Sequence, residues 1–87
     1  MNKKHRQTLK KIFEKPDRSD IPWSSIESLF RTLGAEITEG RGSRVRVALN
    51  DVRAVFHRPH PERVTNKGAI KSVRRFLQEA GENHDGI

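Results

Sequence analysis

The chain has 87 residues, which suffice for one small domain with a single two-layer core, and its hydrophobic and charged fractions are 32% and 33%. Eighteen Lys and Arg against eleven Asp and Glu give a net charge of +7, which indicates either a polyanionic partner or only a soluble basic surface. There is no cysteine, which excludes disulfides and thiolate sites. No apolar run is as long as a signal sequence or a membrane span. We therefore expect a soluble cytoplasmic protein with no membrane partner.

The first twenty residues form a basic extension. Leu9, Ile12 and Phe13 at positions i, i+3 and i+4 predict a short amphipathic helix within residues 2–15, which Pro16 ends. Its Lys-rich face is either a solvated surface behind an apolar stripe that lies on the edge of the domain, or an arm that binds nucleic acid. Residues 17–22 are predicted to be a linker.

A second helix is predicted after Trp23. Residues 24–27, Ser-Ser-Ile-Glu, have the form of a capping box with Ser24 as the N-cap, and apolar residues then follow at helical spacing up to Gly34, which suits a left-handed C-terminal cap. Trp23 adjoins the most apolar helix of the chain, and we interpret it as a lid over the core and not as a platform for base stacking.

Three strands are predicted next, over residues 35–39, 43–49 and 52–57, and the last two form a hairpin around Asn50-Asp51. An odd-length loop would change the pairing, but only one register keeps one face of the hairpin wholly apolar. In that register Val45 lies opposite Phe56, and on the other face Arg44 lies opposite His57.

After the stiff connector at residues 58–61, Thr65 or Asn66 is expected to cap a last helix over about residues 67–80, which Gly81 ends. Arg74 is expected on its outer face, and His5 and His84 are expected to be idle. The predicted fold class is α+β, with the α-β-β-β-α order of the double-stranded-RNA-binding fold: a three-stranded antiparallel sheet has both helices on one face, plus the short N-terminal helical extension. The predicted units are residues 1–20, 21–81 and a flexible tail, 82–87.

The basic residues of the hairpin and of the start of the last helix suit RNA phosphates, because guanidinium groups and helix N-termini both bind phosphate. The candidate RNA-binding residues are Arg41, Ser43, Arg46, Arg53, Arg58, Lys67 and Lys71. His57 and His60 lie at i and i+3, but prolines intervene and no third ligand has a suitable spacing, so we expect no metal and no cofactor.

Four segments together resemble the HicA toxins of HicAB toxin–antitoxin pairs over residues 21–81. They are Gly-Arg-Gly-Ser-Arg-Val-Arg-Val from Gly40, the Asn50-Asp51 turn, Arg58-Pro59-His60-Pro61, and residues 68–81. The resemblance implies the α-β-β-β-α fold, a metal-free mRNA interferase activity and a HicB-type antitoxin that covers the active site. It also implies a catalytic histidine just after Gly42-Ser43, where this chain has Arg44 instead.

Our hypothesis is that the imidazole has moved across the strand pair, with His57 as general base and Arg44 stabilising the phosphorane. His60 is a second acid/base candidate. Alternatively, both histidines only contact phosphate or pack against the prolines. Two other function classes stay open: a non-catalytic RNA-binding module on the same fold, and a protein-interaction domain whose basic face binds an acidic antitoxin. The oligomeric state is not predicted.

Overall fold

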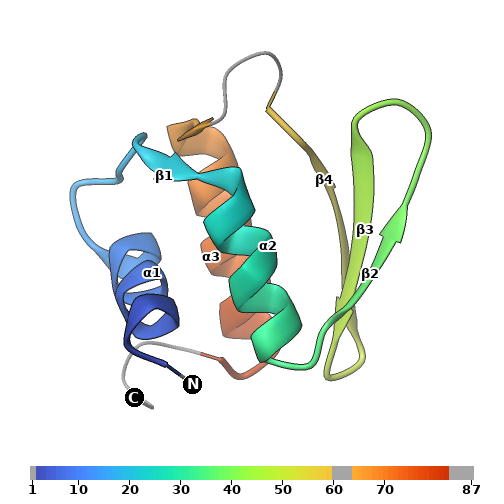
Figure 1. Cartoon of the computed structure of the whole chain (residues 1–87), viewed down its shortest axis with the longest axis horizontal. Coiled ribbons are helices and arrows are strands. Elements are labelled where there is room, and N and C mark those ends of the chain that lie inside the picture. The colour runs from blue at the N-terminus through green and yellow to red at the C-terminus, as the bar shows by residue number, and fades with distance from the viewer. Residues whose placement is uncertain (1, 60–63, 83–87) are drawn as a thin grey trace.

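The computed structural model describes residues 2–59 and 64–82 of the chain (Figure 1). The elements in chain order are α1 (Lys3–Phe13), β1 (Ile21–Pro22), α2 (Trp23–Thr32), β2 (Glu36–Glu39), β3 (Arg44–Leu49), β4 (Val52–His57), β5 (Val64–Thr65) and α3 (Lys67–Glu79). Strands β2, β3 and β4 form an antiparallel sheet in that order, α2 and α3 cover one of its faces, and α1 lies beyond the two helices. This arrangement confirms the predicted fold class.

The predicted hairpin register is confirmed. Val45 pairs with Phe56 and Arg44 pairs with His57 across β3 and β4, and the paired apolar residues alternate with exposed ones along both strands. The turn holds Asn50 and Asp51 at φ values of 50° and 68°, as a two-residue hairpin loop of this hand requires. Asn50 Nδ2 also donates to Ala80 O at 2.8 Å, which fastens the turn to the end of α3.

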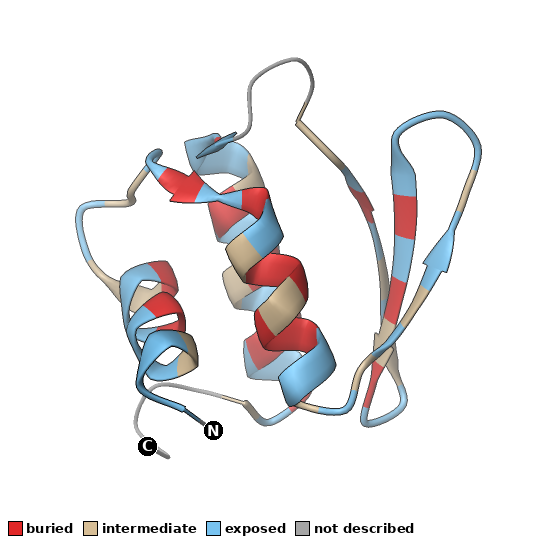
Figure 2. Ribbon diagram, viewed as in Figure 1, coloured by how far each residue is buried: buried red, intermediate tan, exposed pale blue. Residues whose placement is uncertain are grey.

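The core lies between the sheet and the two helices (Figure 2). Its centre is an aromatic cluster in which Phe56 of β4 contacts Trp23, Phe30 and Phe76, with each pair of ring centroids 5.8 Å apart. Trp23 is buried, which fits its interpretation as a core lid. Because neighbouring side chains of a strand point to opposite faces, the burial of Phe56 directs the next residue, His57, outward.

Helix α1 packs on α2, α3 and β1, with Leu9 and Ile12 buried. Asn2 caps it, since His5 N donates to Asn2 Oδ1 at 2.9 Å. The expectation that His5 takes no part in function stays a prediction, but its ring has a structural contact: His5 Nε2 lies 2.7 Å from Ser28 Oγ of α2. The expected position of Arg74 on an outer face is wrong: its Nε donates to Ile12 O at 2.9 Å and its Nη2 pairs with Asp17.

Two further expectations need correction. The predicted linker contains a strand, because Ile21 and Pro22 pair antiparallel with Thr65 and Val64. Ser24 is not the N-cap of α2, which begins at Trp23 with Pro22 in the capping position and no side-chain cap. At the end of the chain, Asn66 and Gly81 behave as predicted: Asn66 Oδ1 accepts from Ala69 N at 2.8 Å, and Gly81 has a φ of 83°.

Candidate functional site

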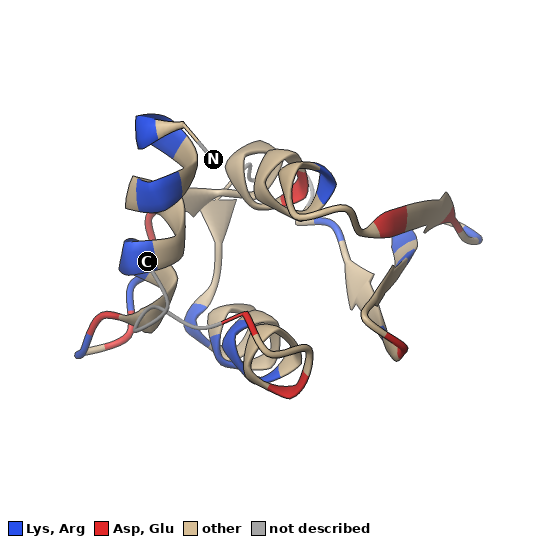
Figure 3. Cartoon of the chain, turned by 90° about the horizontal axis from the view of Figure 1, so that it is seen from below, with Lys and Arg blue, Asp and Glu red and all other residues tan. Residues whose placement is uncertain are grey.

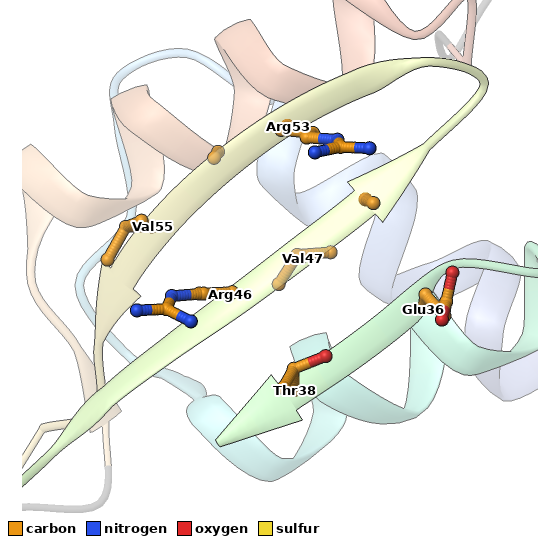
Figure 4. Close-up of a pocket in the computed structure, with 8 residues that line it drawn as sticks. Glu36, Thr38, Arg46, Val47, Arg53 and Val55 are labelled. Carbon is orange, nitrogen blue, oxygen red and sulfur yellow. The ribbon is translucent and has the colours of Figure 1, made fainter. Parts of the chain in front are cut away.

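The candidate site is the face of the sheet that α2 and α3 leave uncovered. Alternate residues of β2, β3 and β4 point to this face and meet in rows that cross the strands. The rows are Glu36–Ala48–Arg53, Thr38–Arg46–Val55 and, at the far end, Gly40–Arg44–His57. Figure 4 shows side chains of the first two rows.

The third row contains the proposed catalytic pair. Arg44 and His57 are both exposed, directly opposite each other on adjacent strands, and the ladder continues past them because Arg58 N donates to Ser43 O at 2.9 Å. On the other side of Arg44, Gly40 N donates to Arg44 O at 2.9 Å. A Cβ at Gly40 would lie 3.1 Å from the Arg44 Cβ, so glycine leaves room beside the guanidinium-bearing residue.

The first two rows line a hollow of about 510 Å³ on the same face (Figure 4). Arg46 and Arg53 border it with two cations. Val55, which pairs with Arg46 across the strands, is 55% exposed, an unusual exposure for a large apolar side chain. Neither Arg44 nor His57 lines the hollow, but Arg46 belongs to the row next to theirs. The hollow therefore adjoins the proposed catalytic pair without containing it.

Arg58, the residue after β4, is held by two carboxylates. Its Nε donates to Glu27 Oε2 at 2.6 Å and its Nη2 to Glu39 Oε2 at 2.6 Å, and its Nη1 pairs with Glu39 Oε1. These hydrogen bonds lower the pKa of Glu39 and raise the pKa of Arg58. The role of Arg58 as an RNA ligand stays a prediction, and phosphate would have to compete there with both carboxylates.

Glu27 is the functional-site neighbour that sequence reasoning missed. It is buried, accepts hydrogen bonds from Arg58 and from Trp23 Nε1, and lies 3.5 Å from Arg31 Nη2. The hydrogen bond from Arg58 is the main cause that holds the pKa of this carboxyl below its usual value. Trp23 and Glu27 are four residues apart, a spacing that lets two side chains of one helix contact each other. The capping-box pattern instead placed Glu27 with Ser24.

The remaining predicted residues that the structure describes lie near one end of the molecule. Arg41 and Ser43 are exposed in the loop between β2 and β3, and this loop, the end of β4 and the start of α3 lie at the same end (Figure 1). Lys67 is exposed at the first position of α3, whereas Lys71 is 3.7 Å from Asp17 Oδ2 through its Nζ. His60 and His84, like most of the predicted tail, lie outside the described residues.

In residues 2–59 and 64–82, no group of three or more His, Asp or Glu side chains is arranged to hold a metal ion. None of the helices described there is long and apolar enough to cross a membrane.

The family model described as the HicA toxin of bacterial toxin–antitoxin systems matches residues 23–82, which is more than half of the chain. Comparisons with curated proteins and with solved structures give no match. The matched range begins at the start of α2 and ends just after α3, so it includes the whole three-stranded sheet with its exposed arginine rows. The chain therefore belongs to the HicA toxin family of bacterial toxin–antitoxin systems.

Proposed function

We propose that this toxin is an RNA endonuclease that cleaves mRNA by metal-independent acid/base chemistry on the exposed face of its sheet, and that a HicB-type antitoxin inhibits it. The observation that carries the proposal is the pairing of His57 with Arg44 in the outermost row of that face. An imidazole can move protons near neutral pH, and a neighbouring guanidinium can bind the phosphate on which negative charge develops.

The proposed reaction uses the ribose 2′-hydroxyl as its nucleophile. The His57 imidazole removes the 2′-hydroxyl proton, the 2′-oxygen forms a bond to phosphorus, and the bond from phosphorus to the 5′-oxygen breaks. Arg44 stabilises the additional negative charge of the phosphorane. An acid, for which His60 is the candidate, protonates the departing 5′-oxygen. The products are a 2′,3′-cyclic phosphate and a free 5′-hydroxyl.

The arginines of the neighbouring rows position the RNA in this proposal. Arg46 and Arg53 are exposed and border the hollow, and neither takes part in an ion pair among the described residues. Phosphate contacts from such residues place the chain without selecting its sequence. The exposed side chain of Val55 offers an apolar surface against which a base or sugar can pack.

A non-catalytic RNA-binding module is the second candidate, and the observation that favours it is Arg44, which stands where the family resemblance implies a catalytic histidine. The purified protein is incubated with RNA in EDTA, and the ends of the fragments are analysed. Fragments with 2′,3′-cyclic phosphate ends support the endonuclease. Binding without cleavage supports the module, and the absence of both contradicts the two candidates.

A further inference from the structure

Most of the net positive charge of the protein lies on and around α1 and not on the sheet. Residues 2–15 contain six Lys and Arg and one acid, a net charge of +5, which leaves +2 for the rest of the chain. The single acid, Glu14, is itself paired with Arg18, with 3.1 Å between Oε2 and Nη1. The cations of α1 therefore have little local compensation, although the family match begins only at residue 23.

The geometry of α1 turns these cations into one surface. Its apolar residues face α2 and α3, and its exposed side is polar throughout (Figures 2 and 3). We define the α1 basic face by its exposed cations, which form no ion pair within residues 2–59 and 64–82: Lys3, Lys4, Arg6, Lys10 and Lys11. Residues three, four or seven apart lie along one side of a helix, so Lys3, Arg6 and Lys10 form a row.

We propose that the α1 basic face is a second RNA-binding surface, which holds the phosphate backbone of a long RNA away from the sheet. This inference rests on the proposed RNA substrate. In Figure 1, α1 and the sheet lie at opposite ends of the longest axis of the molecule, whose extent is 34 Å. An RNA must therefore extend around the protein to reach both surfaces, and the second surface adds affinity through effective concentration.

The composition of the face favours nucleic acid over the other polyanionic partners. An amphipathic helix that enters a lipid surface needs a free apolar side, and that of α1 is already buried against the core, with Ile12 at 0% and Leu9 at 1% exposure. A protein interface needs an apolar centre, and the exposed residues of α1 include no apolar side chain. A row of lysine and arginine without apolar neighbours suits a phosphodiester backbone.

The test measures the affinity of the full chain for a 2′-O-methyl RNA of about 30 nucleotides, across a range of salt concentrations. This RNA lacks the 2′-hydroxyl that the proposed cleavage needs, so its binding can be measured whether or not the protein is a nuclease. The fragment assay tests the proposed cleavage separately. The test variant is Lys3→Gln with Lys10→Gln. The control is Arg31→Gln with Arg75→Gln, which removes the same charge from exposed positions on α2 and α3 where each cation lies beside a carboxylate, Glu27 or Glu79.

The test variant should bind about tenfold more weakly at low salt, and the slope of log affinity against log salt should fall by about 1.4, for two lost phosphate contacts. The control should keep the wild-type slope, and Lys3→Arg with Lys10→Arg should restore binding. Wild-type affinity and slope in the test variant would overturn the proposal. Equal losses in the test and control variants would overturn it too, because net charge alone would then explain the effect. Thermal unfolding of each variant checks whether the fold is retained.

Discussion

Arg58 and Glu27 join the end of β4 to the middle of α2. Arg58 Nε lies 2.6 Å from Glu27 Oε2 and Arg58 Nη2 lies 3.0 Å from Glu27 Oε1, a two-point contact between residues 31 positions apart. Glu27 is also bonded to Trp23, whose ring contacts Phe56 in the core. The residues before and after His57 in the sequence, Phe56 and Arg58, thus both hold the end of β4 against α2.

Replacement of Glu27 by Gln should lower the free energy of unfolding by about 1–3 kcal/mol, because a buried group loses its charge-assisted hydrogen bonds to Arg58. Urea unfolding at pH 7 measures this loss. Glu36→Gln is the matched control, since Glu36 is exposed on the sheet and should change stability by less than about 0.5 kcal/mol. Equal stabilities of the two variants would show that the contact contributes nothing.

The same contact predicts how stability depends on acid. The pKa of Glu27 in the folded protein lies below its ordinary value of 4.5, and Arg58 is the main cause. The stabilisation is therefore complete above about pH 4.5 and is lost as the pH falls through the lowered folded-state value. Glu39 and Asp17 have lowered pKa values for similar reasons and add to the loss. Urea unfolding between neutral and acidic pH should give a shallower acid-side decline for Glu27→Gln than for the wild type; parallel curves would contradict this.

The turn between β3 and β4 predicts opposite effects for its two residues. Both have positive φ, which glycine adopts at lower cost, so Asp51→Gly should stabilise the protein by up to about 1 kcal/mol. Asn50→Gly gains the same freedom but loses the hydrogen bond from Asn50 Nδ2 to Ala80 O, so it should be neutral or destabilising. Thermal unfolding of the two variants checks this. If Asn50→Gly stabilised the protein as much as Asp51→Gly does, the hydrogen bond to Ala80 O would contribute nothing to stability.

The exposed arginines of the sheet should act on binding and not on folding. Arg46→Gln and Arg53→Gln each remove one cation from the border of the hollow, so each should lower the slope of log affinity against log salt by about 0.7 for single-stranded RNA. Their free energies of unfolding should stay close to that of the wild type, because both side chains are exposed. An unchanged slope in both variants would exclude this hollow from the RNA path.

Local sequence signals predicted the parts of the structure that local chemistry determines. The alternation of residues 43–57 determined the register, and with it the pairing of Arg44 and His57, because a shift by one residue would have exposed Val45 and Phe56. Asn66 and Gly81 marked the ends of α3. The Asn66 side chain accepts a hydrogen bond from a free backbone N–H of the first turn, and Gly81 adopts the positive φ that follows the last turn. The family resemblance also rested on short local segments, among them the one that begins at Gly40 and the Asn50-Asp51 turn.

The parts that were missed depend on segments far apart in the chain. The pairing of Ile21 with Thr65 involves two-residue strands, which are too short to show a period. The helical periodicity of α3 places Arg74 on the outer face. In the structure, α1 and the segment after it cover this position, and Asp17 of that segment pairs with Arg74. In the candidate site, the sequence located the arginines but gave no sign that Arg58 would be bound by Glu27 and Glu39.

His57 is proposed to transfer a proton beside Arg44, and the rate of RNA cleavage under single-turnover conditions in EDTA is the sharpest test of that role. His57→Ala should lower the rate by at least about 100-fold, because removal of a general base loses about that factor or more. His5→Gln, which changes the histidine between α1 and α2, is the control and should cleave at the wild-type rate. A wild-type rate of cleavage by folded His57→Ala protein would exclude His57 as the general base.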